Sequence, residues 1–163
     1  MLRVLITGVS GVGKSTVVAR LGELGYKAVD TDFGGWCAPT ADGEALQETA
    51  EPGWVWREGR IRELLDAADA EVLFVSGCVP NQGVFYRDFD HVVLLSAPAE
   101  TVRHRLLTRT GNPYGKTPEQ LEAALRDQRE VEPLLRSGAT VEIDTRAPVD
   151  EVVARLVALV GGQ

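Results

Sequence analysis

The chain has 163 residues, of which 44% are hydrophobic and 25% charged, as expected for a soluble globular protein with a sizeable core. Its formal net charge of −7 and sequence pI near 4.9 argue against a nucleic-acid surface, because phosphate backbones are bound by clustered Lys and Arg. Its two cysteines lack metal or disulfide spacing and no apolar run is long enough to span a membrane, so we expect a cytoplasmic protein with no signal peptide and no membrane partner.

Short β-branched apolar runs alternate with helical patterns along the chain. Strands are predicted at 3–7, 27–30, 71–76, 91–95 and 140–144, and helices at 14–24, 56–68, 99–109, 118–137 and 149–160. This alternation is typical of a parallel sheet covered by helices on both faces. We therefore expect one domain over residues 1–163. Because such sheets bind ligands at the carboxyl ends of their strands, function is expected in the loops at 31–52 and 110–117.

The first predicted strand is followed by GVSGVGKS, residues 8–15, which fits the pattern GxxxxGK[ST]. A chain that wraps a polyphosphate points several backbone N–H groups inward, and glycine permits the conformations this requires. Lys14 would reach the β- and γ-phosphates, while Ser15 would offer its hydroxyl to Mg²⁺ at the start of the next helix. The alternative is a glycine turn without a ligand. The residues predicted to bind ATP here are Gly8, Ser10, Gly11, Val12, Gly13, Lys14, Ser15 and Thr16.

Asp30 and Asp32, in the sequence VDTD, close the second predicted strand. Two carboxylates beside a phosphate-binding lysine suit one acid that holds Mg²⁺ through water and another that accepts a proton from a substrate hydroxyl. The alternative is a pair of turn-forming aspartates. A Walker B strand would end in an acid, but Ser76 occupies that place, so the predicted metal site consists of Ser15, Asp30 and water.

The third predicted strand leads into SGCVPNQG. Gly77 and Cys78 are small enough to leave room for an acceptor at the sheet, and the amides of Asn81 and Gln82 are candidate hydrogen-bond partners for it. We expect Cys78 to be a small buried filler and not a nucleophile, because nothing nearby in the sequence would lower its pKa.

Four arginines lie at helical spacing around the predicted loop 110–117. Arg105 and Arg109 are four residues apart, and Arg126 and Arg129 are three apart, so each pair lies on one helical face. Arginine forks suit the charge that phosphoryl transfer spreads over several oxygens, and a mobile loop carrying them could close over a nucleotide. We expect functional roles for Arg105, Arg109 and Arg129, of which Arg105 and Arg109 are predicted to bind ATP and Arg129 the acceptor. Arg126 is left open, since the same helices carry acids that could pair with any of these side chains.

Together these motifs resemble the P-loop small-molecule and nucleotide kinases, the adenylate-kinase-like group, and in length and layout the chain is most similar to shikimate kinase. GVSGVGKS resembles the phosphate loop, VDTD the DxD motif and RTGNPYGKT the lid, so the similarity covers nearly the whole chain. It implies a three-layer α/β/α fold with a five-stranded parallel sheet, a lid near 109–117 and an acceptor-binding segment near 31–60. It also implies that ATP with Mg²⁺ donates the phosphoryl group.

Further residue roles follow from this resemblance. The first acid of the DxD would help to hold magnesium, and the second, Asp32, would contact the acceptor. GWVWREGRIRELL places Arg57 where shikimate kinase has an arginine that grips the substrate, and QREVEPLL points to Arg129 as a second one. DTRAP resembles the adenine-binding loop before the last helix, where the candidate ATP contacts are Arg146 and Pro148.

Two departures from shikimate kinase argue against shikimate as the acceptor. SGC replaces a run of glycines after the third strand, and TGNPYGKT lacks a further arginine-rich signature of the lid. All three tryptophans lie in the acceptor-binding segment, where a flat ring could stack. Trp36 is the better ligand candidate, whereas Trp54 and Trp56, expected at the start of the next helix, are equally suited to capping the core. A nucleoside or a flat polyol is the preferred acceptor.

Two classes of function remain open. In the first, a kinase transfers the γ-phosphoryl of ATP to a small molecule, and its catalytic residues are Lys14, Asp32 and Arg109. In the second, a nucleotide-binding regulator or ATPase switches a protein surface. The DxD motif in a compact chain favours the kinase, because a switch needs a water-positioning residue and a partner surface. Neither the choice between ATP and GTP nor the choice between monomer and dimer follows from the sequence.

Overall fold

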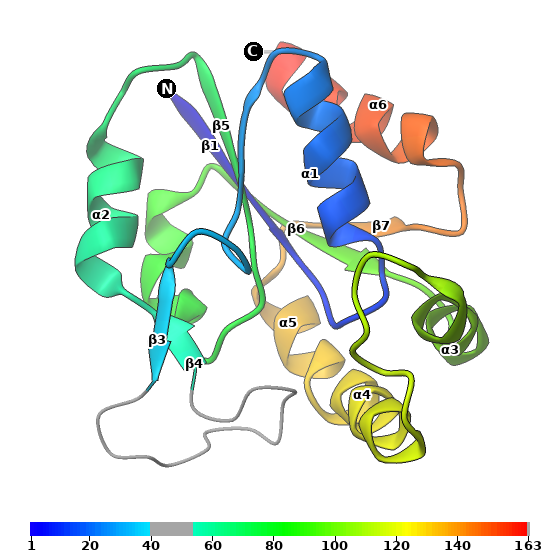
Figure 1. The fold of residues 1–163 in the computed structure, drawn as a ribbon. Coiled ribbons are helices and arrows are strands. Elements are labelled where there is room, and N and C mark those ends of the chain that lie inside the picture. Colours follow the sequence, from blue (N-terminus) through cyan, green and yellow to red (C-terminus); the bar gives the residue numbers. More distant parts are fainter. Residues whose placement is uncertain (40–53, 163) are drawn as a thin grey trace.

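A five-stranded parallel sheet, in the order β2-β5-β1-β6-β7, forms the centre of the computed structural model, which describes residues 1–39 and 54–162 (Figure 1). Its strands are β1 (Leu2–Thr7), β2 (Lys27–Asp30), β5 (Val72–Ser76), β6 (His91–Ser96) and β7 (Val141–Asp144). All five predicted strands are present, and each boundary lies within one residue of the prediction. The α/β fold with a parallel sheet is thereby confirmed.

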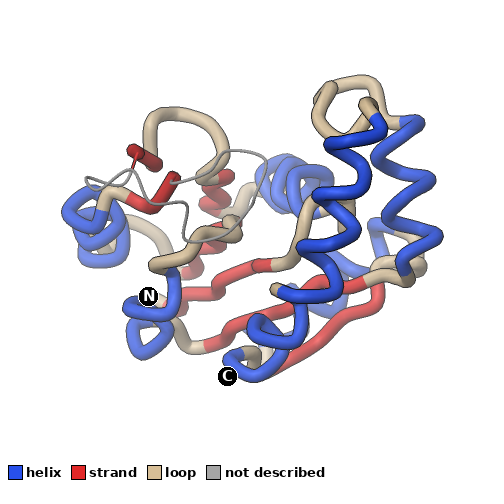
Figure 2. The backbone as a smooth tube through the Cα atoms, turned by 90° about the horizontal axis from the view of Figure 1, so that it is seen from below, coloured by secondary structure: helices blue, strands red, loops and turns tan. Residues whose placement is uncertain are grey.

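Helices lie on both sides of these strands (Figure 2). α1 (Lys14–Glu23) and α6 (Val149–Gly161) pack together over one face, and α2 (Glu58–Asp66) and the 3-10 helix η1 (Gln82–Asp88) cover the other. The remaining helices are α3 (Ala99–Thr108), α4 (Pro118–Glu130) and α5 (Glu132–Gly138). None of the helices in the described ranges is both long and apolar enough to cross a membrane.

Side chains along the central strands alternate between two hydrophobic cores, as the two-residue period of a strand requires. On β1, Val4 and Ile6 belong to the core beneath α1 and α6, whereas Leu5 belongs to the core beneath α2. On β5, Phe74 points to the first of these cores, and by the same alternation Ser76 shares its face. Burial on both faces explains why these strands are continuous apolar runs in the sequence.

The helix predicted over 118–137 is two helices, and that prediction was wrong. α4 ends at Glu130 and α5 begins at Glu132, with Val131 between them. Pro133 has no backbone N–H to donate and its ring clashes with the carbonyl four residues earlier, so the first helix cannot continue through it. The chain turns tightly instead, and the N–H of Leu134 donates to the carbonyl of Val131 at 2.9 Å.

The helix predicted to start at Trp56 starts at Glu58, which corrects the placement of two tryptophans. Trp54 and Trp56 lie in β4 (Trp54–Trp56), which pairs with β3 (Cys37–Pro39) as a two-stranded antiparallel ribbon. Three-residue strands are too short to show a periodic pattern, so the sequence indicated only a loop and a helix start there. The part of the predicted loop 31–52 beyond residue 39 lies outside the described residues.

Candidate active site

The loop between β1 and α1 has the backbone geometry that a phosphate cradle needs. Gly11 and Gly13 have φ values of 88° and 100°, a left-handed conformation that favours glycine. A Cβ at Gly8 would lie 2.6 Å from the carbonyl oxygen of Leu95 and 2.8 Å from Cγ2 of Val12. Each of these three glycines is therefore required either by its backbone angle or by a close neighbour.

Lys14 lies at the junction of this loop and the first helix. Its Nζ donates to the carbonyl oxygens of Gly8 and Val9, the second at 3.1 Å, so the ammonium group lies over the loop. α1 begins at Lys14 with no side-chain cap and no acidic residue in its first turn. The first N–H groups of the helix are thus left for an anion, and Lys14 adds a full positive charge beside them.

Ser15 and Asp30 lie together, as the predicted metal site requires. Ser15 Oγ donates to Asp30 Oδ2 at 2.7 Å, and the other carboxylate oxygen of Asp30 accepts from the N–H of Asp32 at 3.0 Å. The hydroxyl of Ser76 is buried without a partner among the described residues and shares the α1 face of the sheet. These are hard oxygen donors, which Mg²⁺ prefers, and their small number suits an ion that keeps waters and phosphate oxygens as further ligands.

Gly77 serves packing at the carboxyl end of β5. A Cβ there would lie 2.4 Å from Thr31 Oγ1 and 3.0 Å from Trp56 Cζ2, so the room expected beside Gly77 for an acceptor is filled by these two side chains. Trp56 is 1% exposed, and its indole N–H donates to Thr31 Oγ1 at 2.9 Å. Of the two alternatives for Trp56, capping the core is the one the structure shows.

Gly77→Ala is expected to destabilise the fold by about 1–3 kcal/mol, the usual cost of inserting a methyl group into a packed interior. The matched control is Gly83→Ala in η1, where an added Cβ would meet no atom within 4 Å. Urea unfolding monitored by circular dichroism measures both variants. Equal stability of Gly77→Ala and the wild-type protein would contradict the close packing against Thr31 and Trp56.

Cys78 lies next to the charged groups of the site. Burial raises the pKa of its thiol, and the nearby ammonium of Lys14 opposes that shift more weakly. The carboxylates of Asp32 and Asp127 also act on the thiol and raise its pKa. A raised pKa fits the expectation that this cysteine fills space and is no nucleophile.

Asn81 and Gln82 use their side-chain amides within the protein, which differs from the expected role as ligand contacts. The Asn81 amide exchanges two hydrogen bonds of 3.0 Å with the backbone N–H and carbonyl of Trp56. Gln82 Nε2 donates to Thr7 Oγ1 at 3.0 Å and to the Tyr86 hydroxyl at 2.9 Å. These bonds connect the loop after β5 to β4, β1 and η1. Both residues therefore fix the conformation of this loop.

Two arginines at the start of α2 donate hydrogen bonds to the segment that follows the DxD motif. The guanidinium of Arg60 lies 4.1 Å from the ring centroid of Trp36 and donates to the carbonyls at positions 34 and 35, at 2.6 and 2.7 Å. Arg57, the residue before α2, donates from Nε to the carbonyl of Cys37 at 3.3 Å and is exposed. The Arg60 guanidinium therefore packs on the Trp36 ring. The sequence pattern had not indicated a role for Arg60.

The lid residues Arg109 and Tyr114 bond to each other. Arg109 Nη2 donates to the carbonyl of Tyr114 at 2.8 Å, and Nε of Arg109 is buried without a partner in the described part of the chain. Burial lowers the pKa of the Arg109 guanidinium and raises that of the Tyr114 phenol. In this structure Arg109 thus stabilises the predicted lid by bonding to the lid's own backbone at Tyr114.

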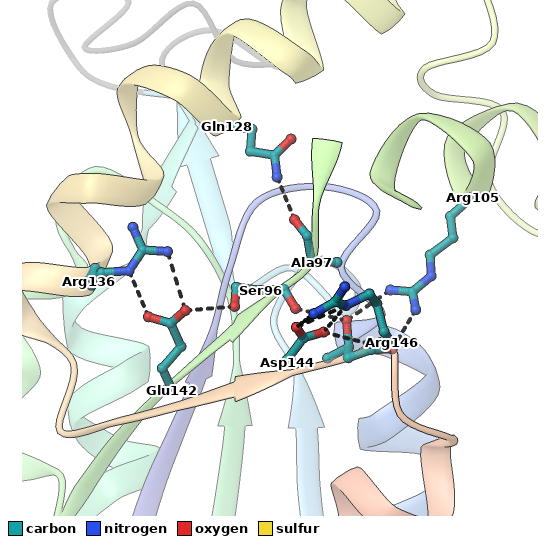
Figure 3. Close-up of polar contacts among 9 residues, drawn as sticks. Ser96, Ala97, Arg105, Gln128, Arg136, Glu142, Asp144 and Arg146 are labelled. Carbon is teal, nitrogen blue, oxygen red and sulfur yellow. Dashed lines mark hydrogen bonds and ion pairs between the residues drawn. The ribbon is translucent and has the colours of Figure 1, made fainter. Parts of the chain in front are cut away.

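The DTRAP segment forms the turn between β7 and α6. Arg146 pairs with Asp144 through Nε and Nη2, at 3.0 and 2.7 Å from Oδ2, and this pairing lowers the pKa of the carboxyl group (Figure 3). Pro148 precedes the first residue of α6. Arg105 reaches from α3 to Thr145 in the same turn. Three of the predicted nucleotide residues therefore meet at this turn.

Comparison with known protein families identifies the family of this chain. The family described as AAA domain matches residues 4–132, from β1 through the phosphate loop and the lid to the start of α5. The chain belongs to the AAA-domain family. No curated protein sequence matches it.

Three solved structures similar to this AAA domain are described as kinases. Shikimate kinase from Acinetobacter baumannii in complex with shikimate aligns with a TM-score of 0.63 and 21% identity, over 99% of this chain and 94% of that one. Shikimate kinase from Bacteroides thetaiotaomicron aligns at 0.60 and 19%, over 98% of each chain. A sugar kinase from Janibacter sp. aligns at 0.59 and 22%, over 97% and 93%. The predicted P-loop kinase fold with a shikimate-kinase layout is confirmed.

The remaining predicted residues of this AAA domain lie around the same loops. Thr16 is exposed in the first turn of α1, Ser10 is half-buried in the phosphate loop, and Arg129 is exposed near the end of α4. Sequence patterns missed Asp127, whose carboxylate raises the pKa of the Cys78 thiol although α4 and β5 are far apart in the chain. Asp127 belongs to no recognisable sequence motif, so its effect on Cys78 becomes evident only from the folded structure.

Proposed function

We propose that the protein is an ATP-dependent phosphotransferase that moves the γ-phosphoryl of ATP to a hydroxyl group of a small-molecule acceptor. The observation that carries this proposal is the cradle of loop, helix N-terminus and Lys14, with the carboxylate of Asp30 bonded to Ser15 at its edge. The similar structures support it, since their names describe kinases of shikimate and of a sugar, both small molecules with hydroxyl groups. We expect it to act in the cytoplasm.

On this proposal, the residues divide between donor and acceptor. Lys14 and the first N–H groups of α1 hold the β- and γ-phosphates, and Ser15 with Asp30 holds Mg²⁺. Bound Mg²⁺ supplies positive charge that offsets the charge developing on the phosphate oxygens. Asp32 positions the acceptor hydroxyl and accepts its proton, because it follows β2 at the carboxyl edge of the sheet, two residues after Asp30.

The acceptor site is proposed to lie between the DxD segment and α4. Trp36 and Arg57 form one wall, and Arg129 approaches from the other side. Cys78 forms part of the floor, and the Asn81 and Gln82 amides act by holding the loop after β5 in place. Gly77 makes no contact with the acceptor, because Thr31 and Trp56 fill the space beside it. A nucleoside or a flat polyol remains the preferred acceptor, because the exposed ring of Phe33 offers flat apolar surface beside polar groups in the same segment as Trp36.

The test is ADP release from ATP measured against a panel of nucleosides, nucleotides and polyols, with shikimate included. A kinase releases ADP at a rate that depends on one acceptor class. Slow release that is the same with every compound would favour an ATPase or regulator and would contradict the proposal.

Ser15→Ala is expected to raise the Mg²⁺ concentration for half-maximal ATP turnover by about tenfold, because the hydroxyl that bonds Asp30 at 2.7 Å is lost. The matched control is Ser137→Ala, whose hydroxyl bonds to the carbonyl of Leu134 at the surface of α5. A Mg²⁺ titration at saturating ATP measures the effect. An unchanged Mg²⁺ requirement in Ser15→Ala would remove this residue from the metal site.

A further inference from the structure

The Arg105 guanidinium joins two loops that are far apart in the sequence. Its Nη1 donates to the carbonyl of Val12 in the phosphate loop at 3.2 Å and to Thr145 Oγ1 at 2.9 Å, and its Nη2 donates to the carbonyl of Thr145. Figure 3 shows the Arg105 side chain reaching toward the turn that carries Asp144 and Arg146. Val12 is fully buried and Thr145 is 6% exposed, so both acceptors are fixed parts of the fold. Arg105 therefore links the phosphate loop to the turn between β7 and α6.

Thr145 is itself anchored to the sheet. Its N–H donates to the carbonyl of Ser96 at 2.8 Å, and its hydroxyl lies 3.3 Å from the same oxygen. Ser96 is the last residue of β6 and pairs with Asp144 at the end of β7. A continuous chain of contacts thus runs from the end of β6 through Thr145 and Arg105 to Val12.

The geometry of this link depends on an arginine. Both Nη atoms of the guanidinium bond to protein oxygens, and the planar fork reaches two loops at once. A lysine ammonium at the same place would keep the charge but is a single point donor on a flexible stem. A role through charge and a role through geometry can therefore be separated by Arg105→Lys.

We propose that Arg105 is a positioning residue that fixes the distance between the phosphate loop and the DTRAP turn, and does not bind the triphosphate itself. The inference rests on the proposed function together with the prediction from the sequence that the DTRAP turn holds the adenine of the nucleotide whose phosphates lie in the phosphate loop. Two subsites bind the two ends of one ligand strongly only when their separation is set beforehand, because otherwise binding must also order them. A ligand that occupies the phosphate loop alone gains nothing from the link.

The test compares ATP with inorganic tripolyphosphate, which carries the phosphates without the nucleoside. Thr145→Val removes the hydroxyl outside the phosphate loop and leaves Arg105 and Val12 unchanged. We expect it to weaken ATP about tenfold and tripolyphosphate less than about twofold, as measured by calorimetry with Mg²⁺. Arg105→Lys is expected to weaken ATP at least as much, despite its retained charge. Arg103→Lys, on the exposed side of α3, is the matched control and should bind both ligands as the wild type does.

The outcomes are distinguishable. Equal losses of ATP and tripolyphosphate affinity in both variants would make Arg105 a phosphate ligand and overturn the inference. Unchanged ATP affinity in both would overturn it as well. A wild-type protein that binds no ATP would instead overturn the proposed function. Circular dichroism melting of each variant identifies any that fails to fold, and Thr145→Val, which removes one hydroxyl, keeps the test available if Arg105→Lys unfolds.

Discussion

Lys14→Ala is expected to lower the rate of phosphoryl transfer by about a thousandfold or more while the fold stays intact. The ammonium lies over the phosphate loop, where it bonds to the carbonyls of Gly8 and Val9. Preorganised charge aimed at a transferring phosphoryl group typically contributes at least this much to the rate. The fold should tolerate the change because Lys14 is only half-buried and takes part in none of the ion pairs between described residues.

The matched control is Lys27→Ala. Lys27 begins β2 and pairs with Asp69 at 2.5 Å, at the opposite end of the strand from the DxD motif. ADP release with the best acceptor of the panel, and the melting temperature, measure both variants. Activity retained in Lys14→Ala would refute the assignment of the loop as a phosphate cradle.

Asp32→Asn is expected to lower kcat by about a hundredfold to a thousandfold while the Kd for ATP changes less than about twofold. Asparagine keeps the shape of the side chain but cannot accept the proton of the acceptor hydroxyl. The donor site should be little affected because the metal-side contact to Ser15 is made by Asp30 and not by Asp32.

Asp30→Asn is the informative comparison, since it changes the carboxylate that bonds Ser15 and should weaken Mg²⁺-dependent ATP binding. Asp66→Asn, at the exposed end of α2, is the neutral control. Single-turnover rates and calorimetric ATP titrations separate the two effects. Parallel losses of kcat and ATP affinity in Asp32→Asn would assign it to the metal and not to the acceptor.

The fold could be predicted where local pattern decides structure. Buried parallel strands are continuous apolar runs, so β1 (Leu2–Thr7) and β6 (His91–Ser96) stood out in the sequence. The two errors came from competing local rules. Pro133 interrupts an otherwise helical pattern, and β4 (Trp54–Trp56) depends on pairing with β3, which no short-range signal shows.

The candidate site divides in the same way. The phosphate loop is contiguous, so its glycines and Lys14 could be predicted from residues 8–15 alone. The contact between Arg105 and Val12 joins residues 93 apart, and the bond from Gln82 to Thr7 joins residues 75 apart. Sequence reasoning therefore named Arg105 and Gln82 as ligand contacts, but could not foresee that other parts of the protein occupy their polar groups.

The most direct test of the account is calorimetric titration of the purified protein with ATP in the presence of Mg²⁺. It predicts saturable binding of one nucleotide per chain with a Kd between about 1 μM and 1 mM, the range typical of enzyme substrates, and no measurable binding to Lys14→Ala. If neither ATP nor GTP binds the wild-type protein, the glycine loop is no nucleotide site and the account is contradicted.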